Sequence, residues 1–177
     1  MKKIVAFGAS SSINSINKKL ATFAANKIPN SQAIILDLNN FEMPIYSEDR
    51  DKLNGIPDKA YEFKKILKKA NGIIISFAEH NGSYTSAFKN IFDWISRIEK
   101  IVWYNKPMFL MATSDGSRGA KSVLESAHIR ISRGNPFNIP KFSLPNFYDN
   151  FSENDGILDN SLKEKFSKSL LLFQKNL

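Results

Sequence analysis

The chain contains no cysteine and only two histidines, His80 and His128. Without cysteine it can form no disulfide, no thiolate metal site and no iron–sulfur cluster, and it has no cysteine nucleophile. Two histidines are also too few for a histidine-rich metal site. We therefore expect no metal centre.

Long apolar runs are also missing. No stretch approaches the roughly 20 apolar residues that span a bilayer. The N-terminal sequence MKKIVAFGASSS has an apolar run too short for a secretory signal, and it is more typical of a first β-strand. These observations predict a cytoplasmic protein without a membrane partner.

Charge is unbalanced, with 25 Lys and Arg against 17 Asp and Glu, a formal net charge of +8. Such a balance raises the question of nucleic-acid binding. However, most lysines recur at helical spacing beside apolar residues, as on solvated outer faces of helices. No recognition motif and no arginine cluster accompanies them. We expect no nucleic-acid partner, and a positive field that attracts anionic substrates or cofactors.

The chain has the size and apolar content of one domain, residues 1–177. Strand-like runs occupy residues 3–9, 32–38, 72–78, 107–113 and 135–141. Apolar residues at helical spacing predict helices over 16–28, 58–70, 85–101, 118–132 and 160–175. The middle three strands are almost continuously apolar, as in a parallel sheet covered on both faces. This alternation predicts an α/β, doubly wound parallel sheet that binds ligands at the carboxyl ends of its strands.

The first loop after a strand, GASSSINSIN at residues 8–17, is rich in small hydroxyl residues and leads into a helix. A helix N-terminus after such a loop favours a bound phosphate. The loop has neither GxGxxG nor a Walker lysine, which leaves a phosphomonoester such as that of flavin mononucleotide, FMN. Three hydroxyls and two amides are its candidate ligands: Ser10, Ser12, Ser15, Ile16 and Asn17. The alternative is a plain helix N-cap at Ser12, Asn14 or Ser15.

The second loop, AEHNGSYTSA at residues 78–87, combines short polar side chains with a glycine and opens a helix. Its backbone can run past a flat aromatic ligand and offer amides to ring atoms. The candidate contacts are Ala78, Glu79, His80, Asn81, Gly82 and Ser83. Glu79 and His80 could form an acid–base pair, but adjacent residues usually point apart, so a polar contact is the simpler interpretation of His80.

The third loop, TSDGSRGA at residues 113–120, follows the next strand. Gly116 and Gly119 permit a close backbone approach, and Ser114 and Asp115 could bond a ring edge. Asp115 could equally be a turn or cap residue.

The predicted helix 85–101 and its exit are unusually aromatic, with Phe88, Phe92, Trp94 and Trp103. These residues could fill the core. They could also exceed what one sheet contact needs and so indicate a subunit interface.

Two of these segments resemble a known family. Residues 9–21, ASSSINSINKKLA, are similar to a motif that reads roughly GSxRxxSxNxxLA. Residues 78–94, AEHNGSYTSAFKNIFDW, are similar to PEYNGSxPxxLKNxIDW, and MPIYSED at 43–49 resembles the link between the second strand and second helix. The whole chain resembles the NAD(P)H-dependent FMN reductases of flavodoxin-like fold, which include quinone, azo-dye and chromate reductases. The departures are Ala9 for Gly, Ser12 for Arg, Ala78 for Pro and His80 for Tyr.

The resemblance implies a five-stranded parallel sheet of order 2-1-3-4-5 with helices on both faces. It implies that the first loop holds the FMN phosphate and that the second and third loops hold the isoalloxazine ring. NADPH or NADH would reduce the flavin, which would pass electrons to a small-molecule acceptor such as a quinone, a flavin or an azo compound. The protein itself would supply no catalytic residue, and helix 85–101 would pack in a homodimer or tetramer.

Two rival functions keep the fold and change the activity. One is a flavodoxin-like electron carrier or flavin-binding module without turnover. Flavodoxins tend to be acidic, so the charge of +8 speaks against a carrier. The other is a protein of this fold that has lost FMN, which the serine at position 12 leaves open.

Overall fold

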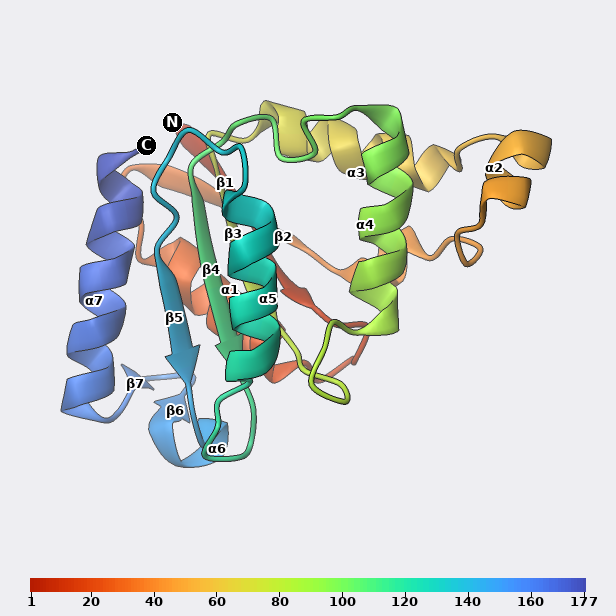
Figure 1. The fold of residues 1–177 in the computed structure, drawn as a ribbon. Helices are drawn as coiled ribbons and strands as arrows, with labels where there is room; N and C mark the ends of the chain where they lie inside the picture. The colour runs from red at the N-terminus through yellow and green to blue at the C-terminus, as the bar shows by residue number, and fades with distance from the viewer.

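A five-stranded parallel sheet forms the centre of the molecule (Figure 1), in a computed structural model that describes all 177 residues. The strand order is β2-β1-β3-β4-β5, which confirms the flavodoxin-like, doubly wound fold. The strands are β1 (Lys2–Ala9), β2 (Ser31–Leu36), β3 (Gly72–Phe77), β4 (Met108–Thr113) and β5 (Lys141–Leu144).

Helices cover both faces of this sheet (Figure 1). One face packs against α3 (Asp58–Lys69), α4 (Ser86–Ile98) and α5 (Lys121–Ser132) in a core of 29 buried residues. The other packs against α1 (Ile16–Asn26) and α7 (Asn160–Lys175) in a core of 18. Alternate residues of β1 enter the two cores, as the strand period of two requires. None of the helices combines the length and apolar character needed to cross a membrane.

The remaining elements are short. They are the 3-10 helix η1 (Leu38–Phe41), helices α2 (Glu48–Asn54) and α6 (Phe147–Asn150), and the antiparallel hairpin of β6 (Phe151–Ser152) and β7 (Gly156–Ile157). Sequence patterns predict none of them. Helix α2 has no buried residue, so no apolar period marks it, and it projects from the body of the molecule (Figure 1).

Four strands lie close to their predicted positions, but the prediction for the fifth is wrong. The expected range was 135–141, whereas β5 is Lys141–Leu144 and shares only Lys141 with it. Two prolines lie in the expected range, Pro136 and Pro140, and proline has no amide for a ladder hydrogen bond. Pairing with β4 therefore starts after the second proline, where Lys141 lies opposite Leu110.

The aromatic residues of α4 and its exit are core residues. Phe88 and Trp94 are each 1% exposed, and Phe92 and Trp103 are each 7% exposed. They pack in the same core as α3 and α5. The core interpretation of these four side chains is therefore correct, and they provide no surplus apolar surface for a partner.

The sheet register brings the three candidate loops to one edge. Ala9 of β1 lies opposite Phe77 of β3, which lies opposite Ala112 of β4. The loops that follow these strands therefore begin side by side. Gly8 lets the first turn of α1 pack closely against β1, because a Cβ at this position would lie 2.4 Å from the backbone nitrogen of Lys18.

Candidate functional site

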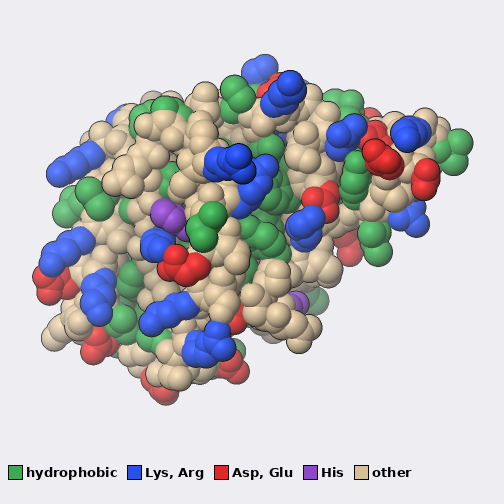
Figure 2. Space-filling model, viewed as in Figure 1, with side chains coloured by type: hydrophobic (Ala, Val, Ile, Leu, Met, Phe, Trp, Pro, Cys, Tyr) green, Lys and Arg blue, Asp and Glu red, His purple; other side chains and the backbone are tan.

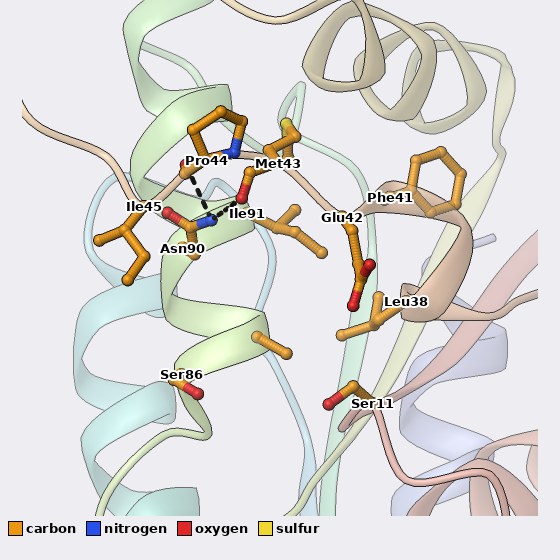
Figure 3. Close-up of a pocket in the computed structure, with 11 residues that line it drawn as sticks. Ser11, Leu38, Phe41, Glu42, Met43, Pro44, Ile45, Ser86, Asn90 and Ile91 are labelled. Atoms are coloured by element: carbon orange, nitrogen blue, oxygen red, sulfur yellow. Dashed lines mark hydrogen bonds between the residues drawn. The ribbon is translucent and has the colours of Figure 1, made fainter. Parts of the chain in front are cut away.

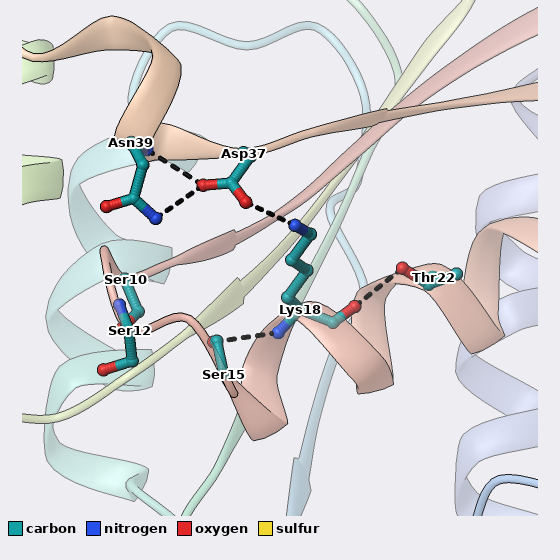
Figure 4. A network of polar contacts seen from close by, with 7 residues as sticks. All are labelled: Ser10, Ser12, Ser15, Lys18, Thr22, Asp37 and Asn39. Carbon is teal, nitrogen blue, oxygen red and sulfur yellow. Dashed lines mark hydrogen bonds and ion pairs between the residues drawn. The ribbon is translucent and has the colours of Figure 1, made fainter.

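The first loop ends in a capped helix with unpaired amides (Figure 4). Ser15 is the N-cap of α1, and its hydroxyl accepts a hydrogen bond from the Lys18 amide at 3.1 Å. Ser10 Oγ accepts from the Ser12 amide at 3.1 Å. The amides of Ile16 and Asn17 have no partner within the chain. The cap interpretation of Ser15 is confirmed, yet the first turn still presents two free N–H donors at the positive end of the helix dipole.

A cation that sequence reasoning did not single out stands beside this loop. Lys18 Nζ lies 2.5 Å from Asp37 Oδ2 (Figure 4), and both side chains are about one-third exposed. Asp37 also accepts hydrogen bonds from the Asn39 amide and side chain. The Lys18 ammonium holds the pKa of Asp37 below its usual value. Helix α1 thus carries a lysine in its first turn, three residues after the cap.

The Asn17 side chain joins the ends of two strands, β3 and β4. Its Oδ1 accepts from Ser76 Oγ at 2.7 Å and from the Thr113 amide at 3.0 Å, and its Nδ2 donates to the Thr113 carbonyl. The residue is only 2% exposed. The Asn17 side chain is therefore occupied in fixing the sheet edge, and only its backbone amide remains available to a ligand.

The second loop is built on a tight turn. His80 and Ser83 exchange two backbone hydrogen bonds of 3.1 Å, and Asn81 and Gly82 between them have φ angles of 51° and 74°. This is a type I′ turn, for which Asn-Gly is the favoured pair. The amides of Asn81 and Gly82 make no hydrogen bond within the chain. The turn therefore offers two more free donors at the same edge.

Glu79 and His80 have separate environments. Glu79 Oε2 accepts the Val123 amide at 2.9 Å and so caps α5, whose first residues have no side-chain cap of their own. His80 is exposed, and no hydrogen bond joins it to Glu79. The structure thus gives no support to an acid–base pair, and it accounts for Glu79 as a cap. Thr85 ties this loop to the first one, because its hydroxyl donates to the Ala9 carbonyl at 2.9 Å.

The third loop packs against the segment after β5. The Gly116 carbonyl accepts from the Asn146 amide and the Ser114 carbonyl accepts from the Phe147 amide, both at 3.0 Å. Gly119 is buried, and a Cβ there would lie 2.5 Å from Ser143 Oγ, so its close approach is to the chain itself. Gly116 faces open space, and Asp115 is exposed without a hydrogen bond to its carboxylate. The outer half of this loop is the part accessible to a ligand.

A cavity of about 530 Å³ lies beside the first and second loops (Figure 3). Three elements enclose it: the first loop, the start of α4, and residues 38–45 after β2. Its lining residues are Ser11, Leu38, Phe41, Glu42, Met43, Pro44, Ile45, Ser86, Ala87, Asn90 and Ile91. None of the predicted ligand residues is among them. Residues 38–46, here called the wall segment, could have been suspected only from the family resemblance of residues 43–49.

Helix α4 holds the wall segment in place. Asn90 Nδ2 donates to the carbonyls of Met43 and Pro44 at 3.0 and 3.2 Å (Figure 3). Asn90 Oδ1 accepts the Tyr46 amide at 2.8 Å. One turn later, Trp94 Nε1 donates to the Pro44 carbonyl at 2.7 Å. These residues belong to the KNIFDW part of the second motif, so this motif positions the cavity wall.

Comparison with known proteins identifies the family of this chain. The family model for NADPH-dependent FMN reductases matches residues 2–149. The chain belongs to this family. It is an oxidoreductase whose cofactor is FMN and whose reductant is NADPH or NADH.

Individual relatives are reductases of quinones and of FMN. A 2-hydroxy-1,4-benzoquinone reductase of a Burkholderia species is 33% identical over 119 residues, which span 66% of this chain and 62% of that enzyme. An NAD(P)H-dependent FMN reductase of Pseudomonas aeruginosa is 24% identical and aligns over 97% of this chain and 93% of its own length. Among solved structures, the flavoenzyme NAD(P)H:(acceptor) oxidoreductase of Paracoccus denitrificans matches with a TM-score of 0.75. Its identity is 18%, and the match covers 99% of this chain and 97% of that one.

The edge of the reductase has the donor chemistry that FMN requires. A phosphomonoester needs several N–H or O–H donors around its oxygens, and the first loop supplies hydroxyls together with the free amides of Ile16 and Asn17. A flat ring with carbonyls and ring nitrogens needs backbone donors without bulky side chains, and Gly82 and Gly116 face open space. The residues present therefore fit the family's cofactor.

Proposed function

We propose that this reductase passes electrons from NADPH or NADH through FMN to a small-molecule acceptor of the quinone, flavin or azo class. The observation that carries this proposal is the set of unpaired backbone amides that the first and second loops present at one edge of the sheet, beside the exposed outer half of the third loop. The quinone, FMN and azo reductases among the relatives support the same range of acceptors.

The first loop is the proposed phosphate site. The hydroxyls of Ser10, Ser12 and Ser15 and the amides of Ile16 and Asn17 surround the start of α1, where the helix dipole favours an anion. Ser10 and Ser15 are each only 7% exposed, so a phosphate there is partly shielded from water. The Lys18 ammonium adds positive charge next to the loop.

The second and third loops are the proposed ring site. It comprises Ala78, Glu79, His80, Asn81, Gly82 and Ser83 with Ser114, Asp115, Gly116 and Gly119. Glu79 and Gly119 contribute by fixing the loops against α5 and β5, since their own contacts are within the chain. The amides of Asn81 and Gly82 are the donors that can reach a ring.

Bound FMN supplies the redox chemistry, because a flavin accepts a hydride and passes electrons on. The residues of this chain bind and orient the two ends of the cofactor and leave room for a second substrate. We therefore assign no catalytic acid, base or nucleophile. The cavity behind the wall segment adjoins both flavin-binding loops through Ser11 and Ser86, and it is the place proposed for the acceptor.

Retention of FMN by two loop variants tests the site. We expect Ser15→Ala and Asn81→Ala each to weaken FMN binding, because the first removes a hydroxyl of the phosphate loop and the second strains a left-handed turn residue. Ser96→Ala, on the exposed side of α4, is the matched control and should retain FMN as the unmodified protein does. If both loop variants bind FMN as tightly as the control, the assignment of these loops is wrong.

A further inference from the structure

The cavity behind the wall segment contains only one ionisable side chain. Six of its eleven lining residues are hydrophobic, one is Pro44, and Ser11, Ser86 and Asn90 are neutral and polar. The exception is Glu42, and no lysine, arginine or histidine lines the cavity. In a protein with a formal charge of +8, the local charge of this cavity is negative.

The Glu42 carboxylate is not neutralised by a neighbour. Its backbone is extended directly after η1, and Figure 3 shows its side chain projecting from the wall segment on the side of Ser11. It takes part in no hydrogen bond and no ion pair, and it is exposed. Its charge therefore acts on whatever enters the cavity.

Two of the cations near the cavity are paired with carboxylates, and a third contacts the wall segment but lies outside the lining residues. The Arg50 guanidinium donates to the Ile45 carbonyl at 2.5 Å; this bond leaves its charge uncancelled, but Arg50 itself does not line the cavity. Lys89, next to Asn90, is paired with Asp93 at 2.6 Å, and Lys18 is paired with Asp37. On the face shown in Figure 2, lysines and arginines are spread among acidic residues and do not form a single basic patch.

A single uncompensated carboxylate changes selectivity by a measurable amount. At an effective dielectric constant of about 40, a carboxylate about 6 Å from an anionic ligand repels it enough to weaken its binding roughly tenfold relative to a neutral ligand. Exposure and salt reduce this factor, and a neutral ligand does not feel it. The apolar lining meanwhile favours a flat hydrophobic molecule, as in most small-molecule pockets.

We propose that this cavity admits neutral or cationic aromatic acceptors and rejects anionic ones, and that Glu42 is the residue that sets this preference. The proposal rests on the proposed function and specifies its acceptor class. It also assigns different charge preferences to the two sites: the start of α1 favours the anionic phosphate of FMN, whereas the cavity with Glu42 disfavours anions.

The test compares two quinones of opposite character, neutral 1,4-naphthoquinone and anionic 1,2-naphthoquinone-4-sulfonate. The FMN-loaded protein, Glu42→Gln and Glu42→Lys are assayed for kcat/KM with each quinone at saturating NADPH or NADH. Glu48→Gln, on the exposed helix α2, makes the same charge change outside the cavity and is the control.

We expect Glu42→Gln to raise kcat/KM for the sulfonated quinone by about tenfold and to leave the neutral quinone within twofold. Glu42→Lys should raise kcat/KM for the sulfonated quinone further. Glu48→Gln should leave kcat/KM unchanged for both quinones. If the ratio between the two quinones is the same in all four proteins, Glu42 does not set acceptor charge.

Binding without turnover separates this inference from the proposed function. Dissociation constants of both quinones are measured by quenching of tryptophan fluorescence, with no reductant present. One outcome is that Glu42→Gln binds the sulfonated quinone more tightly than the unmodified protein does, while the turnover assay shows no quinone reduction. This outcome would support the cavity assignment and overturn the proposed function. Quinone reduction with dissociation constants that are unchanged in Glu42→Gln would support the function and overturn the role of Glu42.

Discussion

At the scale of single residues, polar side chains at the sheet edge perform structural tasks before any ligand arrives. Asn17 and Glu79 lie in the two motifs of the family, and both side chains are engaged within the chain. The sequence shows that a polar residue stands at a loop, but it does not show which partner the side chain meets across the sheet. For this reason the loops could be predicted as sites, whereas the division between ligand-binding and structural residues could not.

Replacement of Asn17 should therefore destabilise the protein even without FMN. Asn17→Ala leaves the Ser76 hydroxyl and the Thr113 amide without their buried partner, a cost of about 2–4 kcal/mol in the free energy of unfolding. Urea denaturation of the FMN-free protein measures it. Asn14→Ala, at an exposed position of the same loop, is the control and should change stability by less than about 0.5 kcal/mol. Equal stability of the two variants would contradict the structural role of Asn17.

At the scale of elements, α4 connects the second loop to the wall of the cavity. Its helical period was visible in the sequence, and the observed range, Ser86–Ile98, lies within the predicted 85–101. The wall segment was not predicted as part of a site, because residues 38–46 form no periodic strand or long helix. Their position depends on hydrogen bonds to Asn90 and Trp94, more than 40 residues away in the chain.

Loss of the Asn90 contacts should loosen the wall segment and spare the flavin loops. In Asn90→Ala the Tyr46 amide and the carbonyls of Met43 and Pro44 lose a partner. We expect backbone hydrogen exchange over residues 42–50 to become at least tenfold faster and the KM for a quinone to rise, with FMN retention unchanged. The adjacent Lys89→Ala breaks only an exposed pair with Asp93 and should show neither effect. Unchanged exchange in Asn90→Ala would mean that the other contacts suffice.

A buried lysine fixes the connection between α4 and β4. Lys64, 2% exposed, donates to the carbonyls of Ile101 and Val102 and lies 3.8 Å from the centre of the Tyr104 ring. Burial lowers the pKa of Lys64 and raises the pKa of Tyr104 to about 12. The two shifts have opposite consequences for stability. Because the folded state disfavours the charged form of Lys64, the free energy of unfolding rises as this lysine loses its proton at high pH. Because the folded state disfavours the charged form of Tyr104, the free energy of unfolding falls as this tyrosine loses its proton at high pH.

Tyr104→Phe isolates the tyrosine contribution, because phenylalanine keeps the ring beside Lys64. The phenol holds its proton more tightly in the folded state, so its contribution is fully present below pH 10 and is lost as pH rises toward 12. Between pH 9 and 11, the free energy of unfolding should fall more steeply in the unmodified protein than in Tyr104→Phe. Urea denaturation at several pH values measures both slopes. Parallel slopes would contradict the raised pKa.

At the scale of the whole molecule, the alternation of strands and helices predicted a doubly wound parallel sheet, and the family resemblance supplied its strand order. Continuous apolar runs marked β2, β3 and β4, and short polar loops after β1, β3 and β4 marked the carboxyl edge. The fifth strand was misplaced because prolines interrupt its approach. The dimer or tetramer through residues 85–101 stays a prediction that rests on the family resemblance, since the aromatic residues that suggested it are buried in the chain itself.

By the proposed function, the three loops hold a flavin that a nicotinamide reduces and an acceptor reoxidises. An absorbance spectrum of the purified protein with added FMN, followed by anaerobic NADPH or NADH and then a quinone, tests it most directly. We expect a bound flavin band at about 450 nm that bleaches with the nicotinamide and returns with the quinone, as flavin chemistry requires. A bound flavin that does not bleach would indicate an electron carrier, and a protein that binds no FMN would contradict the site itself.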